Sequence, residues 1–391
     1  MTAKSFATRT VLDARARAPI NEPAVLPIFQ SAGWAFRSLD EVDAVYEGRE
    51  PGAVYGGSGV PNHEALEALV ASLHGAETAL ATAAGMSAFT AALLQLASSG
   101  SRIVAAHDLY GNTTSLLRDL TKFGVQTQLV DIADERAVEE SLSLPAAVMI
   151  VESISNPRIR VAPIASLAHA VHDRGALLLV DNSLASPYHC RPLELGADLV
   201  IESVTKFLGG HYDIILGCIA GSHSLIDPMR TLASRAGLVA SVFETWLAVR
   251  SIATLDVRMA RSSHNALEVA RWLAQHPKVR AAHYPAIGDA RALSAAAQTL
   301  SHGFGPMLSF EVAPERAAVN RLLANLTDVK LVLSFGGAQT TLSHPATSSH
   351  RSLSPQAREA LGIHDGFLRL SLGLEDAADI IADLDCGLAA V

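Results

Sequence analysis

The sequence predicts an α/β protein built on a mainly parallel β-sheet that is covered by helices on both faces. Short runs of apolar and β-branched residues alternate with helical stretches between residues 77 and 205. These runs lack the polar alternation of a sheet with one solvated face, and continuous apolar strands are typical of parallel sheets buried on both sides. The runs are ETALATA, SRIVAAH, VQTQLVD, AAVMIVES, ALLLVDN and ADLVIESVT.

The segment before this pattern, residues 1–57, reads as an irregular arm. Prolines at four positions interrupt any long helix, because proline lacks an amide proton and clashes with the preceding turn: Pro19, Pro23, Pro27 and Pro51. Such a segment has little core of its own, so we expect it to lie on another surface, such as a second subunit. The first clear helix is NHEALEALVASLHG, whose apolar residues share one helical face and whose pattern ends at Gly75.

The C-terminal part of the chain predicts a smaller α+β domain. From about residue 240 the sequence reads as one long helical stretch that stops before Pro277. Strand-like and helical segments then alternate on a shorter scale: GPMLSFEVA, AAVNRLLANL, VKLVLSFGG, FLRLSLGLED and a final helix. We place the boundary at residue 254, within the long helix, which gives a large domain of residues 58–254 and a small domain of residues 255–391.

Composition excludes several classes of protein. A chain of 391 residues allows two or three domains and can bury a large core without disulfide or metal staples. With 30 Lys+Arg against 39 Asp+Glu, it lacks the basic excess of a general nucleic-acid binder. No apolar run approaches the ~20 residues of a membrane span, and the N-terminal sequence lacks the apolar core of a signal peptide. Because the N-terminal sequence is rich in Arg and Ala, its alternative interpretation is a transit peptide.

The cysteine and histidine spacings favour a cytoplasmic protein without a metal site. Cys190, Cys218 and Cys386 lie far apart in the sequence, so they form neither a CxxC pair nor a disulfide framework and suit a reducing compartment. The histidines show no spacing typical of metal ligands. We therefore expect function to reside in side chains placed at the ends of strands.

Two charged residues follow predicted strands. Lys206 comes directly after ADLVIES, between the hydroxyls of Ser203 and Thr205 and a Gly-Gly turn, which suits an exposed reactive amine. The alternative is a surface lysine in a Gly-rich turn. Asp181 ends the run ALLLVD, where an unpaired buried carboxylate would be costly. It either caps a following helix or pairs with the protonated ring nitrogen of a pyridoxal cofactor.

Two further segments support a cofactor site. ALATAAGMSAF predicts a strand, a small-residue turn at Gly85 and a helix, whose first amides would form an anion site. The alternative is that the small residues only permit close packing. Tyr110 follows the strand SRIVAA and brings an aromatic ring to the same sheet edge, where a planar cofactor could stack. The sequence contains no GxGxxG and no Walker lysine, which disfavours dinucleotides and nucleoside triphosphates.

Taken in order, these segments resemble the cysteine/methionine-metabolism family of pyridoxal-phosphate (PLP) enzymes. That family includes cystathionine synthases and lyases, methionine γ-lyases and homoserine-ester sulfhydrylases. The resemblance runs from PIFQSAGWAF to LRLSLGLED and is carried by SVTKFLGGHYD, ALLLVDNSLASP, RPLELGADLV, LYGNT and HPATSSH. It implies PLP fold type I, the aspartate-aminotransferase-like fold, with a seven-stranded sheet. It also implies a homotetramer, a dimer of dimers whose active sites are shared across the dimer interface.

The resemblance also implies a role for each matching residue. Lys206 would bind the cofactor covalently and later carry protons, Asp181 would keep the pyridine nitrogen protonated, and Tyr110 would stack on the ring; these three are the expected catalytic residues. The expected phosphate ligands are the amides of Gly85 and Met86, the hydroxyls of Ser203 and Thr205, and Tyr55 from the neighbouring subunit. The substrate would be held by Arg369, with Ser334, Asn156 and Tyr55, and Asn156 would also approach the ring oxygen.

One departure from the family pattern concerns the cofactor phosphate. The family usually carries Tyr-Ser-Arg where this chain has Tyr55 followed by two glycines, so Gly57 stands in place of an arginine that binds phosphate across the interface. Arg49 and Arg37 are the nearest candidate replacements in the sequence. The alternative is that Ser58 and the amides of the Gly-rich loop suffice.

The other departures concern the substrate. Asn112, Ser115 and Gln339 stand where family lyases carry a cysteine, an arginine or a glutamate, so groups for the far end of cystathionine are missing. This favours a lyase that eliminates the γ or β substituent of a sulfur- or heteroatom-substituted amino acid, giving a 2-oxo acid and ammonia. The alternative is a γ-replacement transferase of the homoserine-ester sulfhydrylase or cystathionine γ-synthase type. A non-catalytic PLP-binding protein is a third hypothesis, disfavoured because the catalytic residues are all present.

Overall fold

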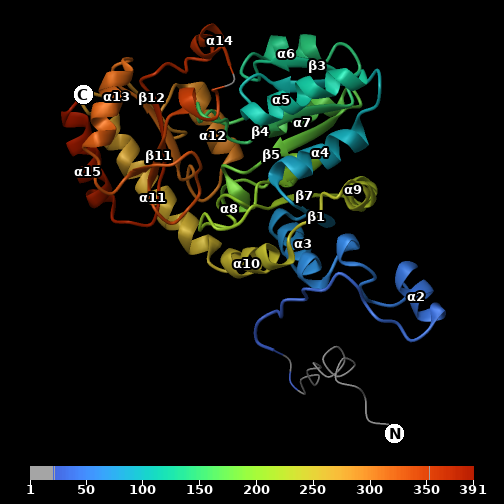
Figure 1. Cartoon of the computed structure of the whole chain (residues 1–391). Helices are drawn as coiled ribbons and strands as arrows, with labels where there is room; N and C mark the ends of the chain where they lie inside the picture. The colour runs from blue at the N-terminus through green and yellow to red at the C-terminus, as the bar shows by residue number, and fades with distance from the viewer. Residues whose placement is uncertain (1–20, 22, 352) are drawn as a thin grey trace.

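The computed structural model describes residues 21, 23–351 and 353–391. Figure 1 shows two α/β units side by side, with the N-terminal segment extending away from the first. The larger unit contains a seven-stranded sheet in the order β1-β7-β6-β5-β4-β2-β3. Its strands are β1 (Thr78–Thr82), β2 (Arg102–Ala106), β3 (Gln126–Val130), β4 (Val148–Glu152), β5 (Leu177–Asp181), β6 (Leu199–Glu202) and β7 (Gly217–Gly221).

This sheet is mainly parallel, as predicted. Only β7 runs antiparallel to its two neighbours, β1 and β6. The other pairs are parallel, so that β2, β4, β5 and β6 end at one edge. Every residue of β4 is buried, which explains why its sequence shows an unbroken apolar run rather than alternation.

Helices cover both faces of the large sheet. The helices of this unit are α3 (Pro61–His74), α4 (Gly85–Leu96), α5 (Gly111–Leu120), α6 (Glu135–Ser141), α7 (Ile164–His172), α8 (Ser186–His189), α9 (His223–Ala236) and α10 (Val242–Ile252). On β1, Leu80 belongs to the core that includes α4 and α9, whereas Ala79 and Ala81 belong to the core on the opposite face, with α3 and α10. The helix predicted from NHEALEALVASLHG is α3, and Gly75 ends it in the left-handed region with φ 66°.

The prediction of a single long helix after residue 240 is wrong. The chain forms α10 and then α11 (Leu255–Leu273), and the residues between them interrupt the helical hydrogen bonding. Arg258, in the first turn of α11, is buried and donates hydrogen bonds to the carbonyl oxygens of Phe207 and Leu208. The helix therefore holds the loop that follows Lys206. The boundary at residue 254 falls at this break and remains a proposal, as do the domain limits 58–254 and 255–391.

The smaller unit is α+β, as predicted, and the structure builds it around a five-stranded sheet. The strand order is β10-β11-β12-β9-β8, and the β12–β9 pair at its centre is antiparallel. Its strands are β8 (Ala281–His283), β9 (Met307–Glu311), β10 (Lys330–Leu331), β11 (Thr341–Ser343) and β12 (Phe367–Ser371), and its further helices are α12 (Ala290–Thr299), α13 (Arg316–Ala324), α14 (Pro355–Ala360) and α15 (Ala377–Ala389). Its core joins Phe310, Leu368 and Leu384 to the apolar face of α11.

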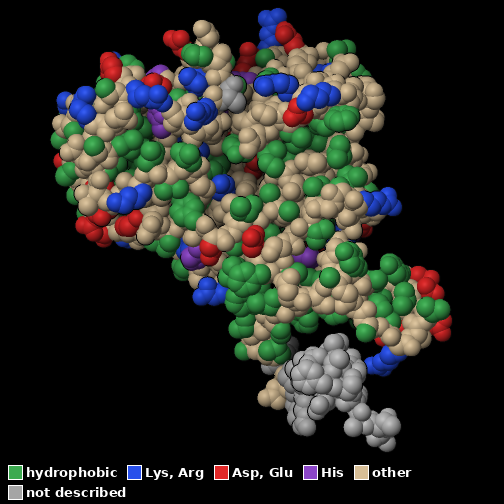
Figure 2. Space-filling model, viewed as in Figure 1, with side chains coloured by type: hydrophobic (Ala, Val, Ile, Leu, Met, Phe, Trp, Pro, Cys, Tyr) green, Lys and Arg blue, Asp and Glu red, His purple; other side chains and the backbone are tan. Residues whose placement is uncertain are grey.

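The described part of the N-terminal arm includes the helix α2 (Leu39–Tyr46) and leaves large apolar side chains in solvent. Leu39 is 82% exposed, Tyr46 70% and Val25 61%. Hydrophobic atoms are visible on this segment and on the neighbouring body of the protein in Figure 2. The described residues of the arm belong to none of the hydrophobic cores, as the sequence led us to expect. No helix among the described residues combines the length and apolarity that crossing a bilayer requires.

Candidate active site

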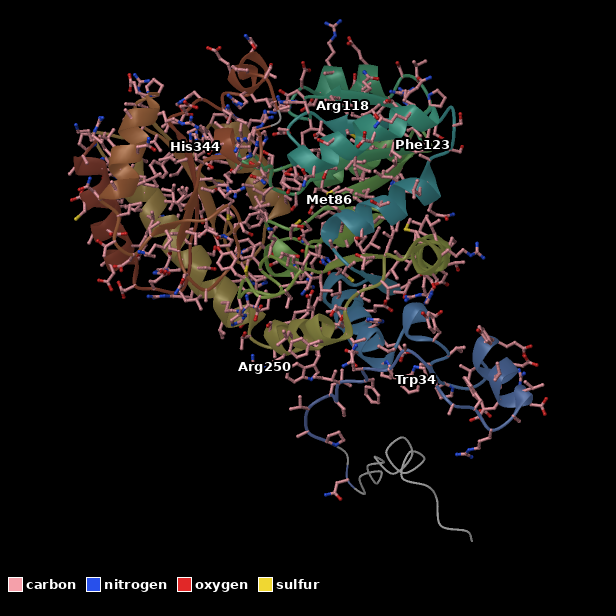
Figure 3. All side chains as sticks on the ribbon, in the orientation of Figure 1. Trp34, Met86, Arg118, Phe123, Arg250 and His344 are labelled. Atoms are coloured by element: carbon pink, nitrogen blue, oxygen red, sulfur yellow. The ribbon has the colours of Figure 1, made fainter. Side chains whose placement is uncertain are left out.

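Most of the predicted site residues converge on one cavity between the two units. Its volume is about 920 Å³, and it lies where β2, β4, β5 and β6 end. It is lined by nine of the residues singled out from the sequence: Gly85, Met86, Tyr110, Asn156, Asp181, Ser203, Thr205, Lys206 and Arg369. Figure 3 labels Met86 at the start of α4, facing the region between the units. Parallel strands with a shared carboxyl edge thus bring together side chains that are far apart in the sequence.

Lys206 is the amine of this cavity. Its Nζ donates a 2.8 Å hydrogen bond to Ser334 Oγ and lies 4.8 Å from the centre of the Phe335 ring. Burial, together with the positive charge of Arg369, lowers the pKa of Lys206 to about 8, and Asp181 opposes this shift. The amine is therefore far more often neutral near physiological pH than an exposed lysine, which suits a nucleophile and a base.

Asp181 ends β5 and accepts a 2.9 Å hydrogen bond from the Ser183 amide. Burial raises the pKa of Asp181, and the hydrogen bonds from Ser183 and the charge of Lys206 oppose this shift. No arginine among the described residues forms a salt bridge with Asp181. A cationic group in the cavity would complete its pairing, which is the role predicted for a protonated ring nitrogen.

The start of α4 forms an anion-binding turn. Its cap residue Ala84 has no side-chain hydrogen bond to the helix, so the first amides remain available to a ligand. A Cβ on Gly85 would lie 3.1 Å from the Cβ of Ser203, so glycine permits the close approach of these two backbones. The Ser203 hydroxyl makes no hydrogen bond to the described residues and is free to donate.

Glu152 fixes two of the predicted residues. This buried carboxylate ends β4 and accepts hydrogen bonds from the amides of Tyr110, at 2.6 Å, and Asn156, at 2.9 Å. Burial and the neighbouring charge of Asp181 raise the pKa of Glu152 well above its ordinary value. The sequence analysis missed Glu152, although it stands at the end of the strand AAVMIVES as Asp181 does at the end of ALLLVD. The same strand-end signal could have identified it.

Arg369 brings a positive charge from β12 of the small unit. It is only 4% exposed, donates from Nη1 to Asn156 Oδ1 and lies with its Cζ 5.0 Å from the centre of the Phe335 ring. Its Nε is buried without a hydrogen-bond partner among the described residues. Burial lowers the pKa of Arg369 to about 10, which leaves it charged at neutral pH. Such a guanidinium has donors left for a substrate carboxylate.

Phe335 was also missed by the sequence analysis. Its ring lies under both Lys206 and Arg369 and so sets the spacing of the two cations. The next residue, Gly336, has φ 95°, and a Cβ there would come within 3.0 Å of Lys206 backbone atoms. The loop after β10 can therefore approach Lys206 only because glycine follows the phenylalanine.

Three predicted residues are placed differently from the rest. Thr205 lines the cavity, but its hydroxyl donates to the Leu216 carbonyl and accepts from the Leu216 amide, so its only proton is already used. Ser334 is not among the cavity-lining residues and reaches the site through Lys206. Tyr55 lies on the arm, is 59% exposed and does not line the cavity of its own chain. Its predicted role requires a second copy and remains a prediction.

Among the described residues, Arg49 is the nearest candidate upstream of Gly57 to replace the missing arginine, and its guanidinium is already paired. Arg49 pairs with Glu47 at 2.6 Å, and both side chains are largely exposed. A Cβ on Gly57 would lie 2.8 Å from the Tyr55 ring, which must move to accept a larger residue. The part of the chain that the structure describes contains no group of three or more His, Cys, Asp or Glu residues arranged for a metal ion.

These groups fit pyridoxal phosphate. The cavity offers an amine with a lowered pKa, a carboxylate without a cationic partner, an aromatic ring and an anion-binding turn in contact with a free hydroxyl. The close packing of Gly85 on Ser203 and the unpaired Nε of Arg369 are observations that a bound anionic cofactor and a substrate carboxylate would explain.

The comparisons agree with this site. A model of the Cys/Met metabolism PLP-dependent enzyme family matches residues 7–389, so the chain belongs to that family and uses pyridoxal phosphate as cofactor. An L-methionine gamma-lyase from Pseudomonas putida is 37% identical over 388 residues, 98% of this chain and 97% of the relative. An O-succinylhomoserine sulfhydrylase from Pseudomonas aeruginosa is 35% identical over 388 residues, 99% and 96% of the two chains.

A solved structure confirms the predicted fold type. A cystathionine gamma synthase from Xanthomonas oryzae pv. oryzae, in complex with aminoacrylate and cysteine, matches with a TM-score of 0.90 and 31% identity. The match covers 100% of this chain and 99% of that one. The chain is therefore a PLP-dependent enzyme of fold type I, in a family whose members include both lyases and transferases.

Proposed function

We propose that this enzyme is a lyase that eliminates the γ or β substituent of a sulfur- or heteroatom-substituted amino acid. Water is consumed, and the products are a 2-oxo acid, ammonia and the protonated leaving group. The observation that carries the proposal is that Lys206, Asp181, Tyr110 and Arg369 all line one cavity. The similarity to an L-methionine gamma-lyase supports elimination, and Asn112, which donates a 3.1 Å hydrogen bond to the Tyr110 hydroxyl, brings no charge to that position.

In this proposal each residue has a chemical role. Arg369 and Asn156 bind the α-carboxylate of the substrate and so orient Cα beside Lys206. The Nζ of Lys206 takes the proton from Cα and then moves a proton at Cβ when the γ substituent leaves. Ser334 accepts a hydrogen bond from that Nζ and keeps it directed into the cavity. When bound, pyridoxal phosphate supplies the electron sink that makes the Cα proton acidic.

Asp181 and Tyr110 would keep the electron sink effective. The Asp181 carboxylate favours the positively charged form of a nitrogen placed next to it. Tyr110, fixed through its amide by Glu152, offers its ring face to a planar cofactor. Gly85, Met86 and Ser203 would hold the phosphate with two amides and one hydroxyl.

The second candidate function is γ-replacement, in which a thiol takes the place of the leaving group. The similarity to an O-succinylhomoserine sulfhydrylase and to a cystathionine gamma synthase structure supports it. Elimination and replacement share the proton transfers at Cα and Cβ, so the same residues serve both. A non-catalytic role is disfavoured because no predicted catalytic side chain is missing.

We also propose that the enzyme works in the cytoplasm as a homotetramer, a dimer of dimers whose active sites are shared between subunits. The exposed apolar side chains of the arm, such as Leu39 and Tyr46, support burial against a second copy. Tyr55 would then enter the active-site cavity of a neighbouring subunit. The three free cysteines fit a reducing compartment.

One substrate screen tests the proposed function. Methionine, cystathionine and the O-acetyl and O-succinyl esters of homoserine are incubated with the PLP-loaded enzyme, with and without methanethiol. Equal amounts of 2-oxo acid and ammonia without thiol indicate a lyase. A new thioether amino acid, formed at the expense of the 2-oxo acid when thiol is added, indicates replacement. Absence of turnover with every substrate, in a protein that is yellow with cofactor, would contradict both.

A further inference from the structure

Tyr212 adopts a backbone conformation that bulky residues rarely occupy. Its φ is 60°, in the left-handed region, where a Cβ crowds the following carbonyl oxygen. The side chain is 38% exposed and belongs to none of the hydrophobic cores formed by the described residues. Packing in a core therefore does not account for this conformation. Backbone strain of this kind persists where surrounding contacts hold the residue in place, and it is concentrated at functional sites.

The contacts of Tyr212 cross from the large unit to the small one. Its Oη and Thr341 Oγ1 form a 2.9 Å hydrogen bond, and Thr341 is the first residue of β11. Its ring lies against Gly337, because a Cβ added at Gly337 would overlap that ring. Gly337 belongs to the β10–β11 loop, residues 332–340, which joins β10 to β11. Tyr212 therefore contacts this loop within its length and also the strand into which it leads.

The β10–β11 loop carries two side chains that contact the amine of the active site. Ser334 accepts the hydrogen bond from Lys206 Nζ, and the ring of Phe335 lies 4.8 Å from the same atom. Both residues are within three positions of Gly337, where the Tyr212 ring supports the loop. A displacement of the loop at Gly337 would therefore also displace the two groups that surround the amine.

The turn between Lys206 and Tyr212 is itself held in place. The Gly210 amide donates a 2.7 Å hydrogen bond to the Lys206 carbonyl oxygen. The buried guanidinium of Arg258 donates a 2.6 Å hydrogen bond to the Phe207 carbonyl oxygen. Tyr212 thus occupies a defined position relative to Lys206, from which its side chain can fix the loop of the other unit.

We propose that Tyr212 is a positioning residue that holds the β10–β11 loop, and with it Ser334 and Phe335, against Lys206. The ring supports the loop at Gly337, and the hydroxyl holds the start of β11. These two contacts also maintain the left-handed conformation of Tyr212. The inference concerns the surroundings of the amine, so it applies to elimination and to replacement alike.

The pKa of Lys206 in the cofactor-free enzyme measures whether the loop is in place. In Tyr212→Gly the loop loses both contacts and the amine becomes more hydrated. The midpoint of Lys206 labelling by trinitrobenzenesulfonate should therefore rise by about one pH unit. Glycine adopts the left-handed region without strain, so the backbone of the turn is retained. Tyr212→Phe keeps the ring and should show a smaller rise. An unchanged midpoint in Tyr212→Gly would overturn the proposal.

Tyr284→Phe is the matched control for the loss of a tyrosine hydrogen bond. The Tyr284 hydroxyl donates a 2.9 Å hydrogen bond to the Gly305 carbonyl oxygen, and Tyr284 does not line the active-site cavity. This variant should keep the native midpoint. An equal rise in the control would attribute the effect to general loosening of the protein and contradict the proposal. Thermal unfolding verifies that each variant folds.

A second substitution tests the contact between Tyr212 and Gly337. In Gly337→Ala the new methyl group meets the Tyr212 ring, so the loop must move and the midpoint should rise. In the double variant with Tyr212→Gly the space is free, and Gly337→Ala should add little to the effect of the first substitution. Additive effects, or no effect of Gly337→Ala alone, would show that this contact does not position the loop.

Hydrogen exchange reports on the loop directly in the PLP-loaded enzyme. Peptides that cover residues 332–340 should exchange at least about fivefold faster in Tyr212→Gly than in the native enzyme, because the loop loses its contacts with the large unit. The same peptides should exchange at the native rate in Tyr284→Phe. Neither exchange nor labelling requires turnover, so both results are independent of the proposed reaction. Native exchange rates in Tyr212→Gly would refute the role assigned to Tyr212.

Discussion

Lys206 Nζ and Ser334 Oγ are joined by a 2.8 Å hydrogen bond that connects the two units of the protein. Lys206 follows β6 of the large sheet, and Ser334 lies on the loop between β10 and β11 of the small one. The next residue of that loop, Phe335, supports the lysine with its ring. The orientation of the amine therefore depends on the small unit as well as on its own strand.

Replacing Ser334 should slow the reaction more than it weakens substrate binding. In Ser334→Ala the Lys206 amine loses its partner, and we expect kcat to fall roughly five- to tenfold, as the loss of one hydrogen bond to a charged or reactive group does. KM should change much less. Ser294→Ala, on the exposed face of α12, is the control. A Ser334→Ala enzyme with normal kcat would show that the bond does not orient the amine.

The lowered pKa of Lys206 predicts an unusual pH dependence in the cofactor-free enzyme. The group is protonated below a pKa of about 8 and neutral above it, whereas a model lysine loses its proton near pH ~10.4. Labelling of Lys206 by trinitrobenzenesulfonate, followed by peptide mapping, should therefore rise with a midpoint near pH ~8. Arg369→Met should move this midpoint upward, because the Arg369 charge contributes to the shift. A midpoint above pH ~10 in the native enzyme would contradict the assignment.

Turnover should require the negative charge of Asp181, and a neutral side chain of the same shape should not replace it. Asp181→Asn keeps the size of the side chain and removes the charge that would favour a protonated ring nitrogen. With saturating cofactor we expect kcat to fall by roughly a hundredfold or more. Asp198→Asn, a change in a carboxylate that pairs with His172 outside the cavity, should leave kcat nearly unchanged. Near-normal turnover by Asp181→Asn would remove Asp181 from the mechanism.

Glu152 should matter for both stability and cofactor binding. Its two carboxylate oxygens accept from the amides of Tyr110 and Asn156, and in Glu152→Gln one oxygen becomes a donor facing an N–H group. We expect a loss of roughly 1–3 kcal/mol in the free energy of unfolding, the cost of an unsatisfied buried group, together with weaker PLP binding. Denaturant unfolding and cofactor titration measure the two effects. Glu139→Gln, on the exposed surface, is the control.

Much of the large sheet could be predicted because its strands are buried on both faces. Unbroken apolar runs such as β4 and β5 can be recognised directly in the sequence. Polar residues that follow the strands, such as Asp181 and Lys206, indicate the edge of the sheet at which the site lies. β7 was harder to recognise, because glycines at both of its ends, Gly217 and Gly221, shorten its apolar run. Glycine is needed at 217, since a Cβ there would lie 2.2 Å from the Ala84 carbonyl oxygen.

Other features depend on contacts that periodicity does not encode. The break between α10 and α11 occurs although the apolar spacing continues across residues 253–254. Tertiary packing decides that the Thr205 hydroxyl forms its hydrogen bonds with the Leu216 backbone. It also decides that the Phe335 ring lies beneath the cations of Lys206 and Arg369.

Reductive labelling tests whether Lys206 is the residue that carries the cofactor. The enzyme is purified with pyridoxal phosphate, reduced with sodium borohydride, digested and mapped by mass spectrometry. We expect a pyridoxyl-phosphate label on the peptide that contains Lys206, and no label in Lys206→Ala treated in the same way. A label on any other lysine, or equal labelling of the Lys206→Ala protein, would contradict it.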